Sequence, residues 1–190
     1  MNAQEVHELL EEQGAIRTGH FLLSSGKHSG VFVQLALVLM HPGIAERLGH
    51  QLGMRFRSAS PTIVLGPAMG GVIIGHEIAR FLNIPLIFSE REEGKMTLRR
   101  GFTLSSDDRV LIAENTVSTG GSQKEVVELA RSHGADVVGV AAIVDRSPGV
   151  SFGVLFEPLL KLDVEAWDAD ACPLCAEGST PEAPGSRHLR

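Results

Sequence analysis

Short apolar runs alternate along the chain with segments in which apolar residues recur at helical spacing. Four runs are too short for helices and are bounded by polar residues or turns, as buried parallel strands are: residues 62–65, 85–88, 110–113 and 137–144. Residues 42–57, 72–82 and 126–130 instead repeat their apolar positions every three or four residues, as amphipathic helices do. This order predicts an α/β fold with a central, mostly parallel sheet flanked by helices.

The two ends of the chain fall outside this alternation. Asn2 is expected to cap a first helix that Gly14 ends. Residues 21–39 contain two apolar runs around the turn 24–30, which predicts a hairpin outside the main sheet, a hood over its edge. Residues 154–160 are predicted as an edge strand, because Pro158 cannot donate a hydrogen bond within a central ladder.

From Asp168 the sequence is rich in small, acidic and proline residues, and we expect the last dozen residues to be loose. These boundaries divide the chain into an N-terminal helix and hood (1–40), an α/β core (41–165) and a C-terminal tail (166–190).

Composition and charge narrow the class of protein. A chain of 190 residues, 43% of them hydrophobic, fits one α/β domain with a small appendage. A net charge of −6 argues against a nucleic-acid binder, which would need a basic face. No apolar run approaches the roughly 20 residues of a membrane span, and the N-terminus lacks the basic-then-apolar pattern of a signal peptide. We therefore expect a cytoplasmic protein with no membrane partner.

The two cysteines both lie in the motif Cys172-Pro-Leu-Cys175, which suits a reducing compartment. With His188 nearby, the pair could form half of a zinc site. A structural zinc takes four ligands, so metal is expected here only if a matching pair comes from another subunit.

Residues 110–122 combine a buried strand, the loop Ser118-Thr-Gly-Gly-Ser122 and the start of a helix. Glycines let a backbone approach a phosphate closely, and the amides at a helix N-terminus attract negative charge. Glu114 cannot bind phosphate itself and suits sugar hydroxyls or a metal. A second glycine-rich turn, 66–71, follows the neighbouring strand, so both turns should meet at one ligand. Spacing alone leaves open an ordinary strand–turn–helix corner.

The segment Glu114-Asn-Thr-Val-Ser-Thr-Gly-Gly-Ser122 resembles the phosphoribosyl-diphosphate (PRPP) loop of the type I phosphoribosyltransferases. That loop has a hydrophobic strand, two acidic residues, two small residues and then Thr-Thr-Gly or Ser-Thr-Gly. Further segments, in the expected order, resemble the orotate phosphoribosyltransferases of this family: Gly19–Ser29, Gly66–Gly71, Ile143–Ser147 and Cys172–Cys175.

The resemblance implies the family's fold and activity. The activity is an Mg²⁺-dependent pentosyl transfer in pyrimidine (UMP) biosynthesis, in which orotate and PRPP give orotidine 5'-phosphate and pyrophosphate. A homodimer with shared active sites is also implied.

The resemblance further assigns residues to PRPP. Amides of the loop would hold the 5-phosphate, and Glu114 and Asn115 would take the ribose hydroxyls. Mg²⁺ would be held by PRPP and water, with no direct protein ligand. The implied catalytic residues are Lys95, Arg91, Glu114 and Asn115; the implied PRPP contacts are Arg91, Lys95, Glu114, Asn115, Thr116, Val117, Ser118, Thr119, Gly120, Gly121 and Ser122.

The charged segment 89–101 has two interpretations. It is either a solvated hairpin loop, the usual meaning of a charge run, or a mobile lid that closes over the leaving pyrophosphate. By resemblance, Arg91 and Lys95 are the basic residues of that lid, and the lid reaches into the neighbouring subunit's site.

Orotate is expected to contact Arg146, Ser118 and Phe32. Arg146 follows the strand 137–144, and its planar fork suits a carboxylate held by two hydrogen bonds. Phe32 lies where the family places an aromatic ring against the base. The alternatives are that Arg146 pairs with Asp145 or another acid and that Phe32 is a core residue of the hood.

Four residues depart from the family pattern. Asn115 replaces a second carboxylate, Gly70 and Glu92 stand where relatives often carry lysine, and Ser24 stands where some carry a basic residue. These departures keep two alternatives open: transfer to another base, and a non-catalytic PRPP-binding paralogue or regulator. A regulator would usually carry a nucleic-acid-binding extension, and this acidic chain shows none.

Overall fold

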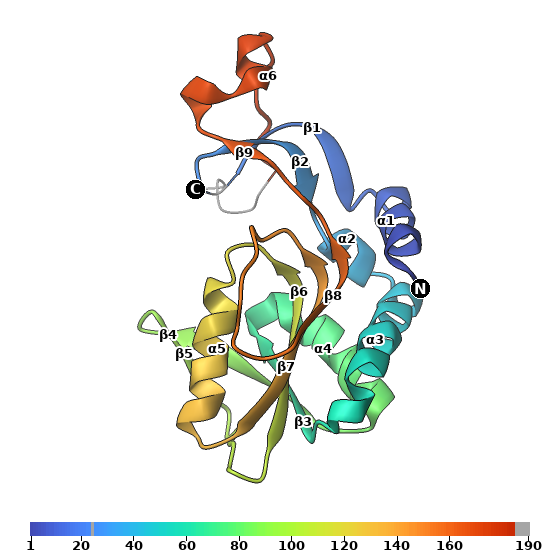
Figure 1. Cartoon of the computed structure of the whole chain (residues 1–190), viewed down its shortest axis with the longest axis vertical. Helices are drawn as coiled ribbons and strands as arrows, with labels where there is room; N and C mark the ends of the chain where they lie inside the picture. Colours follow the sequence, from blue (N-terminus) through green and yellow to red (C-terminus); the bar gives the residue numbers. More distant parts are fainter. Residues whose placement is uncertain (24, 185–190) are drawn as a thin grey trace.

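The computed structural model describes residues 1–23 and 25–184. Within them, the main sheet has six strands in the order β5-β4-β3-β6-β7-β8 (Figure 1). All neighbours are parallel except β5, which pairs antiparallel with β4. The strands are β3 (Ile63–Pro67), β4 (Leu86–Glu92), β5 (Lys95–Leu98), β6 (Arg109–Val117), β7 (Asp136–Asp145) and β8 (Phe156–Lys161). The predicted fold class is confirmed, and the strand that contains Pro158 does lie at an edge.

Helices cover both faces of this sheet. Helices α3 (Pro42–Phe56) and α4 (Ala68–Leu82) pack on one face, with α1 (Ala3–Glu12) and α2 (Ala36–Leu39) beside them, and α5 (Gly121–Ser132) covers the other (Figure 1). Successive side chains of a strand point to opposite faces. Leu111 of β6 therefore packs in the α3/α4 core and Ile112 in the α5 core. Both faces are buried, which is why these strands are continuous apolar runs in the sequence.

The predicted N-terminal helix is confirmed together with its cap. The Asn2 side chain accepts a hydrogen bond from the Glu5 amide at 2.9 Å, and the Glu5 carboxylate accepts one from the Asn2 amide at 2.8 Å. Gly14, with φ +67°, follows the helix end. Val6 and Leu10 are fully buried in the main core. The first helix is therefore part of the α/β core rather than of the hood.

The hood is a small sheet, separate from the main one and with strand order β1-β2-β9 (Figure 1). Its strands are β1 (Ile16–Leu22), β2 (His28–Val33) and β9 (Ala166–Trp167). The predicted hairpin is confirmed, but it begins at Ile16, and residues 36–39 form α2 instead of continuing its second strand. The third strand comes from the tail, so the hood is built from both ends of the chain.

The expectation of a loose C-terminal end is wrong for the residues up to 184. The Glu182 amide donates to the His20 carbonyl and the Leu22 amide donates to the Glu182 carbonyl, both at 2.8 Å. The Glu182 carboxylate pairs with Arg17 at 2.8 Å. Ser24 and His188, on which two sequence interpretations depended, lie outside the described residues. The remaining short elements are η1 (Arg57–Ala59), η2 (Ala169–Ala171) and α6 (Pro173–Ala176).

The charged segment 89–101 forms a regular β-hairpin. Strand β4 continues to Glu92, turns through Glu93 and Gly94, and pairs with β5. Both turn residues have positive φ, +48° and +83°, as tight hairpin turns require. The hairpin projects from the edge of the sheet (Figure 1). Residues 89–98 therefore form the hairpin of the first interpretation, while the lid role stays a prediction.

No helix in the described part of the chain combines the length and apolarity needed to cross a bilayer.

Candidate active site

A cavity of about 230 Å³ opens at the carboxyl ends of β3 and β6. The two glycine-rich segments meet there, as the sequence predicted. It is lined by Pro67, Gly70, Met96, Glu114, Asn115, Thr116, Ser118, Thr119, Gly120, Gly121, Ser122 and Gln123.

The loop at 118–122 leads directly into α5. Gly120 precedes the helix with φ +76°, and a Cβ there would lie 2.5 Å from Cγ2 of Val150. Only glycine fits this combination of a left-handed backbone and close packing. The N-cap residue Gly120 has no side chain, and Oγ1 of Thr119 accepts a long hydrogen bond, 3.4 Å, from the Gly121 amide. The amides of Ser122 and Gln123 in the first turn of α5 are left available to an anion in the cavity.

The second glycine-rich segment differs from its prediction. It is not a separate turn, because β3 runs into α4 at Pro67 and Ala68, and Gly70 and Gly71 lie in the first helical turn. A Cβ on Gly70 would lie 2.8 Å from a Glu114 carboxylate oxygen and 3.0 Å from Oδ1 of Asn115. A lysine at position 70 would therefore meet the acidic side of the cavity. The absence of a side chain keeps this space open.

Glu114 is the carboxylate of the cavity and is only 7% exposed. It accepts hydrogen bonds from the Asn115 amide at 2.8 Å and from Nε2 of Gln123 at 2.7 Å. Burial raises the pKa of Glu114 to about 7, although these two hydrogen bonds act in the opposite direction. A carboxyl with this pKa is close to its protonation midpoint at neutral pH.

Asn115, Thr116 and Val117 lie in β6, because the strand extends further than its apolar run. Asn115 and Thr116 are half-buried and line the cavity. The Val117 side chain is fully buried in the α5 core, so Val117 can offer a ligand only its backbone.

A larger cavity, about 840 Å³, lies on the other side of the same loop. Ser118 and Thr119 line both cavities. The larger one is completed by Arg146 and Ser147 after β7, by residues 162–166 and by Leu23, Ser25 and Lys27 at the tip of the hood hairpin. The hood therefore closes over the carboxyl ends of β6 and β7.

Arg146 has no ion pair among the described residues, so the alternative pairing with Asp145 is not observed. The Asp145 carboxylate instead accepts a hydrogen bond from the Ser147 amide at 2.8 Å. Nε of Arg146 is buried without a hydrogen-bond partner in the described structure. Burial lowers the pKa of the Arg146 guanidinium from its ordinary value. A partly buried, unpaired cation at the wall of a cavity is suited to an anionic ligand.

Three predicted site residues lie apart from these cavities. The exposed Arg91 pairs with Glu125 of α5 at 3.0 Å. Lys95 is exposed on β5, next to Met96, which lines the smaller cavity. The Phe32 ring packs against the Phe21 ring with centroids 5.6 Å apart and does not line either cavity. This placement agrees with the alternative that Phe32 is a packing residue of the hood.

Sequence reasoning missed Gln123, Met96 and Lys27. Gln123 had a signal: it occupies the same helical face as Val126, Val127 and Ala130, and a polar residue on an apolar face calls for a buried partner. Met96 and Lys27 had none, because only the tertiary fold brings β5 and the hood hairpin to the loop.

Comparisons with known proteins agree with this geometry. Residues 37–151 match the phosphoribosyl transferase domain family. The orotate phosphoribosyltransferase of Caldanaerobacter subterraneus subsp. tengcongensis is 46% identical over 190 residues, the full length of both chains. That of Thermotoga maritima is 48% identical over 186 residues, covering 97% of this chain and all of the relative. The crystal structure of orotate phosphoribosyltransferase from Aeropyrum pernix superposes with a TM-score of 0.69 at 26% identity, over 83% of this chain and 93% of that one. The chain therefore belongs to the orotate phosphoribosyltransferases of the phosphoribosyl transferase family.

Proposed function

We propose that this protein transfers the ribosyl 5-phosphate group of PRPP to a ring nitrogen of orotate and releases pyrophosphate. The observation that carries the proposal is the pair of cavities that share Ser118 and Thr119. One offers amides and a carboxylate to a phosphorylated sugar, and the other offers an unpaired arginine to a carboxylate.

On the PRPP side, loop amides and the N-terminus of α5 would bind the 5-phosphate. Glu114 and Asn115 would accept hydrogen bonds from the ribose hydroxyls. In the reaction, the bond from the sugar carbon C1 to the diphosphate breaks and the bond to the ring nitrogen forms. Positive charge develops on the ribose between these events, and the ionised form of Glu114 would stabilise it.

The residues present fit a Mg²⁺ ion carried by the substrate. Glu114 already accepts two hydrogen bonds, and Asn115 beside it is neutral, so the chain offers no carboxylate pair for a protein-held ion. Mg²⁺ suits phosphate oxygens and water. When bound, it would neutralise the diphosphate; Glu114, Asn115 and the loop would orient the ribose.

On the orotate side, Arg146 would bind the carboxylate in two hydrogen bonds, and Ser118 would position the ring. Uracil lacks this carboxylate and would leave the buried arginine unpaired, which disfavours it as a substrate. Phe32 could stack on the base only if its ring left Phe21.

Arg91 and Lys95 would act from the β4–β5 hairpin. Both are exposed on a projecting edge, which supports a role across the interface of a homodimer, where the hairpin would cover the partner's diphosphate. Cytoplasmic location and the absence of nucleic-acid and membrane partners remain predictions from the sequence.

The test is orotate disappearance, followed by ultraviolet absorbance, with PRPP and Mg²⁺ and with PRPP omitted as control. Uracil, adenine and hypoxanthine form the competing panel. Turnover of a different base would contradict the assignment to orotate. The presence of one carboxylate in the PRPP cavity supports a second candidate, a non-catalytic PRPP binder. Calorimetric PRPP binding without turnover of any base would favour that candidate.

A further inference from the structure

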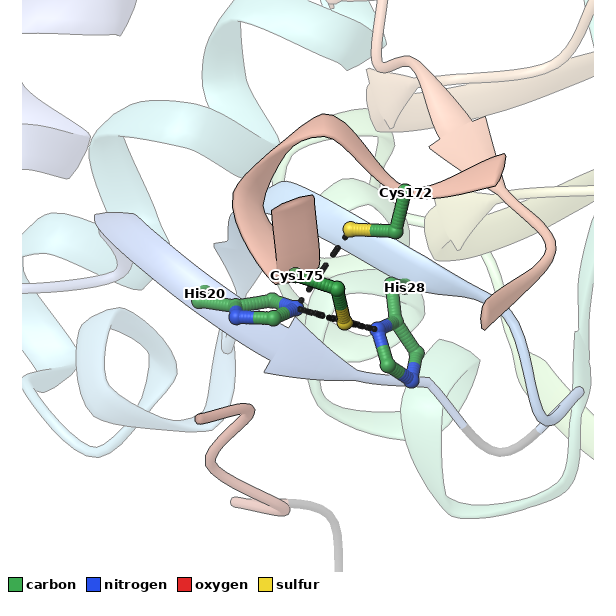
Figure 2. Close-up of side chains that lie close together, drawn as sticks. All are labelled: His20, His28, Cys172 and Cys175. Carbon is green, nitrogen blue, oxygen red and sulfur yellow. Dashed lines mark hydrogen bonds between the residues drawn. The ribbon is translucent and has the colours of Figure 1, made fainter. Parts of the chain in front are cut away.

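Four metal-binding side chains meet between the hood hairpin and the C-terminal segment. His20 comes from β1, His28 from the start of β2, and Cys172 and Cys175 from the beginning and middle of the α6 turn. Figure 2 shows the two imidazole rings and the two thiols pointing toward one another. One ligand atom of each residue lies within 4.8 Å of the other three.

The distances agree with a tetrahedral site. With Zn–S bonds of about 2.3 Å and Zn–N bonds of about 2.0–2.1 Å, tetrahedral angles place S and N ligands about 3.5 Å apart and two N ligands about 3.3 Å apart. Here Nε2 of His20 is 3.5 Å from Sγ of Cys172 and 3.8 Å from Sγ of Cys175. Nδ1 of His28 is 3.3 Å from Sγ of Cys175 and 3.0 Å from Nε2 of His20.

Hydrogen bonding alone does not account for this arrangement. Nε2 of His20 faces two thiols and one imidazole nitrogen at once. A ring nitrogen carries either one hydrogen or one lone pair, so it cannot satisfy three partners. A cation at the centre satisfies all four groups, because each then directs a lone pair to the same point.

The surroundings are those of a closed structural site. His20, His28 and Cys172 are 8%, 6% and 3% exposed. The second ring nitrogen of His20, Nδ1, lies 3.1 Å from Oγ of Ser179, which can accept its hydrogen and so orient the lone pair of Nε2 toward the cluster. The two cysteines are free thiols separated by two residues, the usual spacing of a zinc-binding pair.

We propose that His20, His28, Cys172 and Cys175 bind one zinc ion that fastens the C-terminal segment to the hood. Two thiolates and two imidazoles in a tetrahedron favour zinc over harder or square-planar ions. Four protein ligands leave no open position, so the role is structural and not catalytic.

The hood needs such a link. Ile16 and Val33, at the base of the hairpin, pack against the main core, but buried Phe21 of the hood and buried Cys172 of the C-terminal segment belong to neither of the two cores of the main domain. A small sheet without a core of its own requires a staple. His28 directly follows the hairpin tip, whose residue Lys27 lines the larger cavity with Arg146. Loss of zinc should therefore loosen the hood side of that cavity and leave the loop at residues 118–122 in place.

The first experiment measures zinc in the purified full-length chain by mass spectrometry of the metal. About one zinc per chain is expected, and Cys175→Ser and His20→Gln should each lose it. His76→Gln is the matched control, because His76 is exposed on α4, outside the cluster. Zinc that persists in both cluster variants would overturn the assignment of the ligands.

The second experiment does not depend on the folding of any variant. Zinc is removed from the wild-type chain by a chelator, and Co²⁺ is added as a spectroscopic probe. Intense visible bands and thiolate charge transfer at one Co²⁺ per chain would support a tetrahedral thiolate site. A weak octahedral Co²⁺ spectrum would overturn the proposal. Two thiols that react freely with a thiol reagent in the presence of excess zinc would also overturn it, as would a Cys172–Cys175 disulfide in the native protein. Neither experiment uses orotate or PRPP. The outcome for zinc is therefore independent of whether the protein catalyses the proposed reaction.

Discussion

Replacing Glu114 with glutamine should stabilise the folded protein at alkaline pH and weaken catalysis. The carboxylate is buried and accepts hydrogen bonds from the Asn115 amide and from Gln123. Glutamine has nearly the same shape and retains one acceptor oxygen. The Gln123 amide can turn over to present its own oxygen to the new NH₂ group, so both hydrogen bonds can be kept.

The magnitude follows from the pKa of Glu114, which burial raises from 4.5 to about 7. A shift of this size corresponds to about 3 kcal/mol between the two protonation states. Because the pKa in the folded state is raised, the stability contributed by the neutral carboxyl is fully present below pH 4.5 and is lost as the pH rises through about 7. The glutamine variant has no such loss, so its advantage in unfolding free energy should grow by up to about 3 kcal/mol between acidic pH and about pH 8.

The assay is urea unfolding of wild type and variant, without ligands, at a series of pH values across this window. The difference between the two proteins cancels the other titrating groups. Glu128→Gln is the matched control, because Glu128 is an exposed carboxylate on α5 and its surface pairing with Arg131 is worth at most about 1 kcal/mol.

We also expect kcat with orotate to fall by roughly 10²-fold in Glu114→Gln, since the charge facing the developing cation is gone.

A difference in unfolding free energy that stays constant with pH would refute the reasoning, because the buried carboxyl would then ionise as freely in the folded chain as in the unfolded one. A variant that is less stable than wild type at about pH 8 would refute it as well.

Four other changes test the site. Arg146→Ala should reduce kcat/KM for orotate by roughly 10²-fold, because leaving the orotate carboxylate unpaired costs about 3 kcal/mol of binding free energy, while calorimetric PRPP binding should change little. Equal losses of orotate use and PRPP binding would make the role of Arg146 structural. A Lys95→Ala chain mixed with an Arg146→Ala chain should regain activity above the sum of the two parents, and the absence of a gain would confine Lys95 to its own subunit. Asn115→Asp should raise kcat more than PRPP affinity, because a second negative charge matters most as the ribose cation develops. An unchanged or lower kcat in a folded variant would mean that the site is adapted to one carboxylate. Gly120→Val should lower the unfolding free energy by more than about 1 kcal/mol and abolish PRPP binding, owing to its φ of +76° and the nearby Val150; normal calorimetric binding would contradict the role of the loop.

Much of the fold was predictable because it depends on local patterns. Apolar runs and helical spacing placed the main strands and helices in the correct order, and Pro158 identified the edge strand. The errors have physical causes. Strand β6 continues through Glu114 to Val117 because it pairs with β7, and the polar residues there gave no local sign of that partner. For the charged segment after Phe88, a hairpin was one of the two interpretations, but the regular strand β5 was not predicted, because exposed edge strands carry no apolar run to reveal them.

The sequence alone also determined the strand–loop–helix geometry around residues 118–122, since β6, the glycine-rich turn and the start of α5 follow one another within a dozen consecutive residues. Tertiary structure decided the rest. Arg146 and Asp145 are neighbours in sequence, yet they do not pair. The carboxylate of Asp145 accepts a hydrogen bond from the Ser147 amide, and Arg146 lines the larger cavity with its Nε unpaired in the described structure. Glu114 has a raised pKa because folding buries it. Cys172 and Cys175 showed half of a metal site, and the fold supplies the other half from His20 and His28 of the same chain, about 150 residues away. Ligands so far apart leave no spacing pattern in a sequence. In the folded chain, the pairing of β9 with β2 and the hydrogen bonds of Glu182 with β1 bring them to one point.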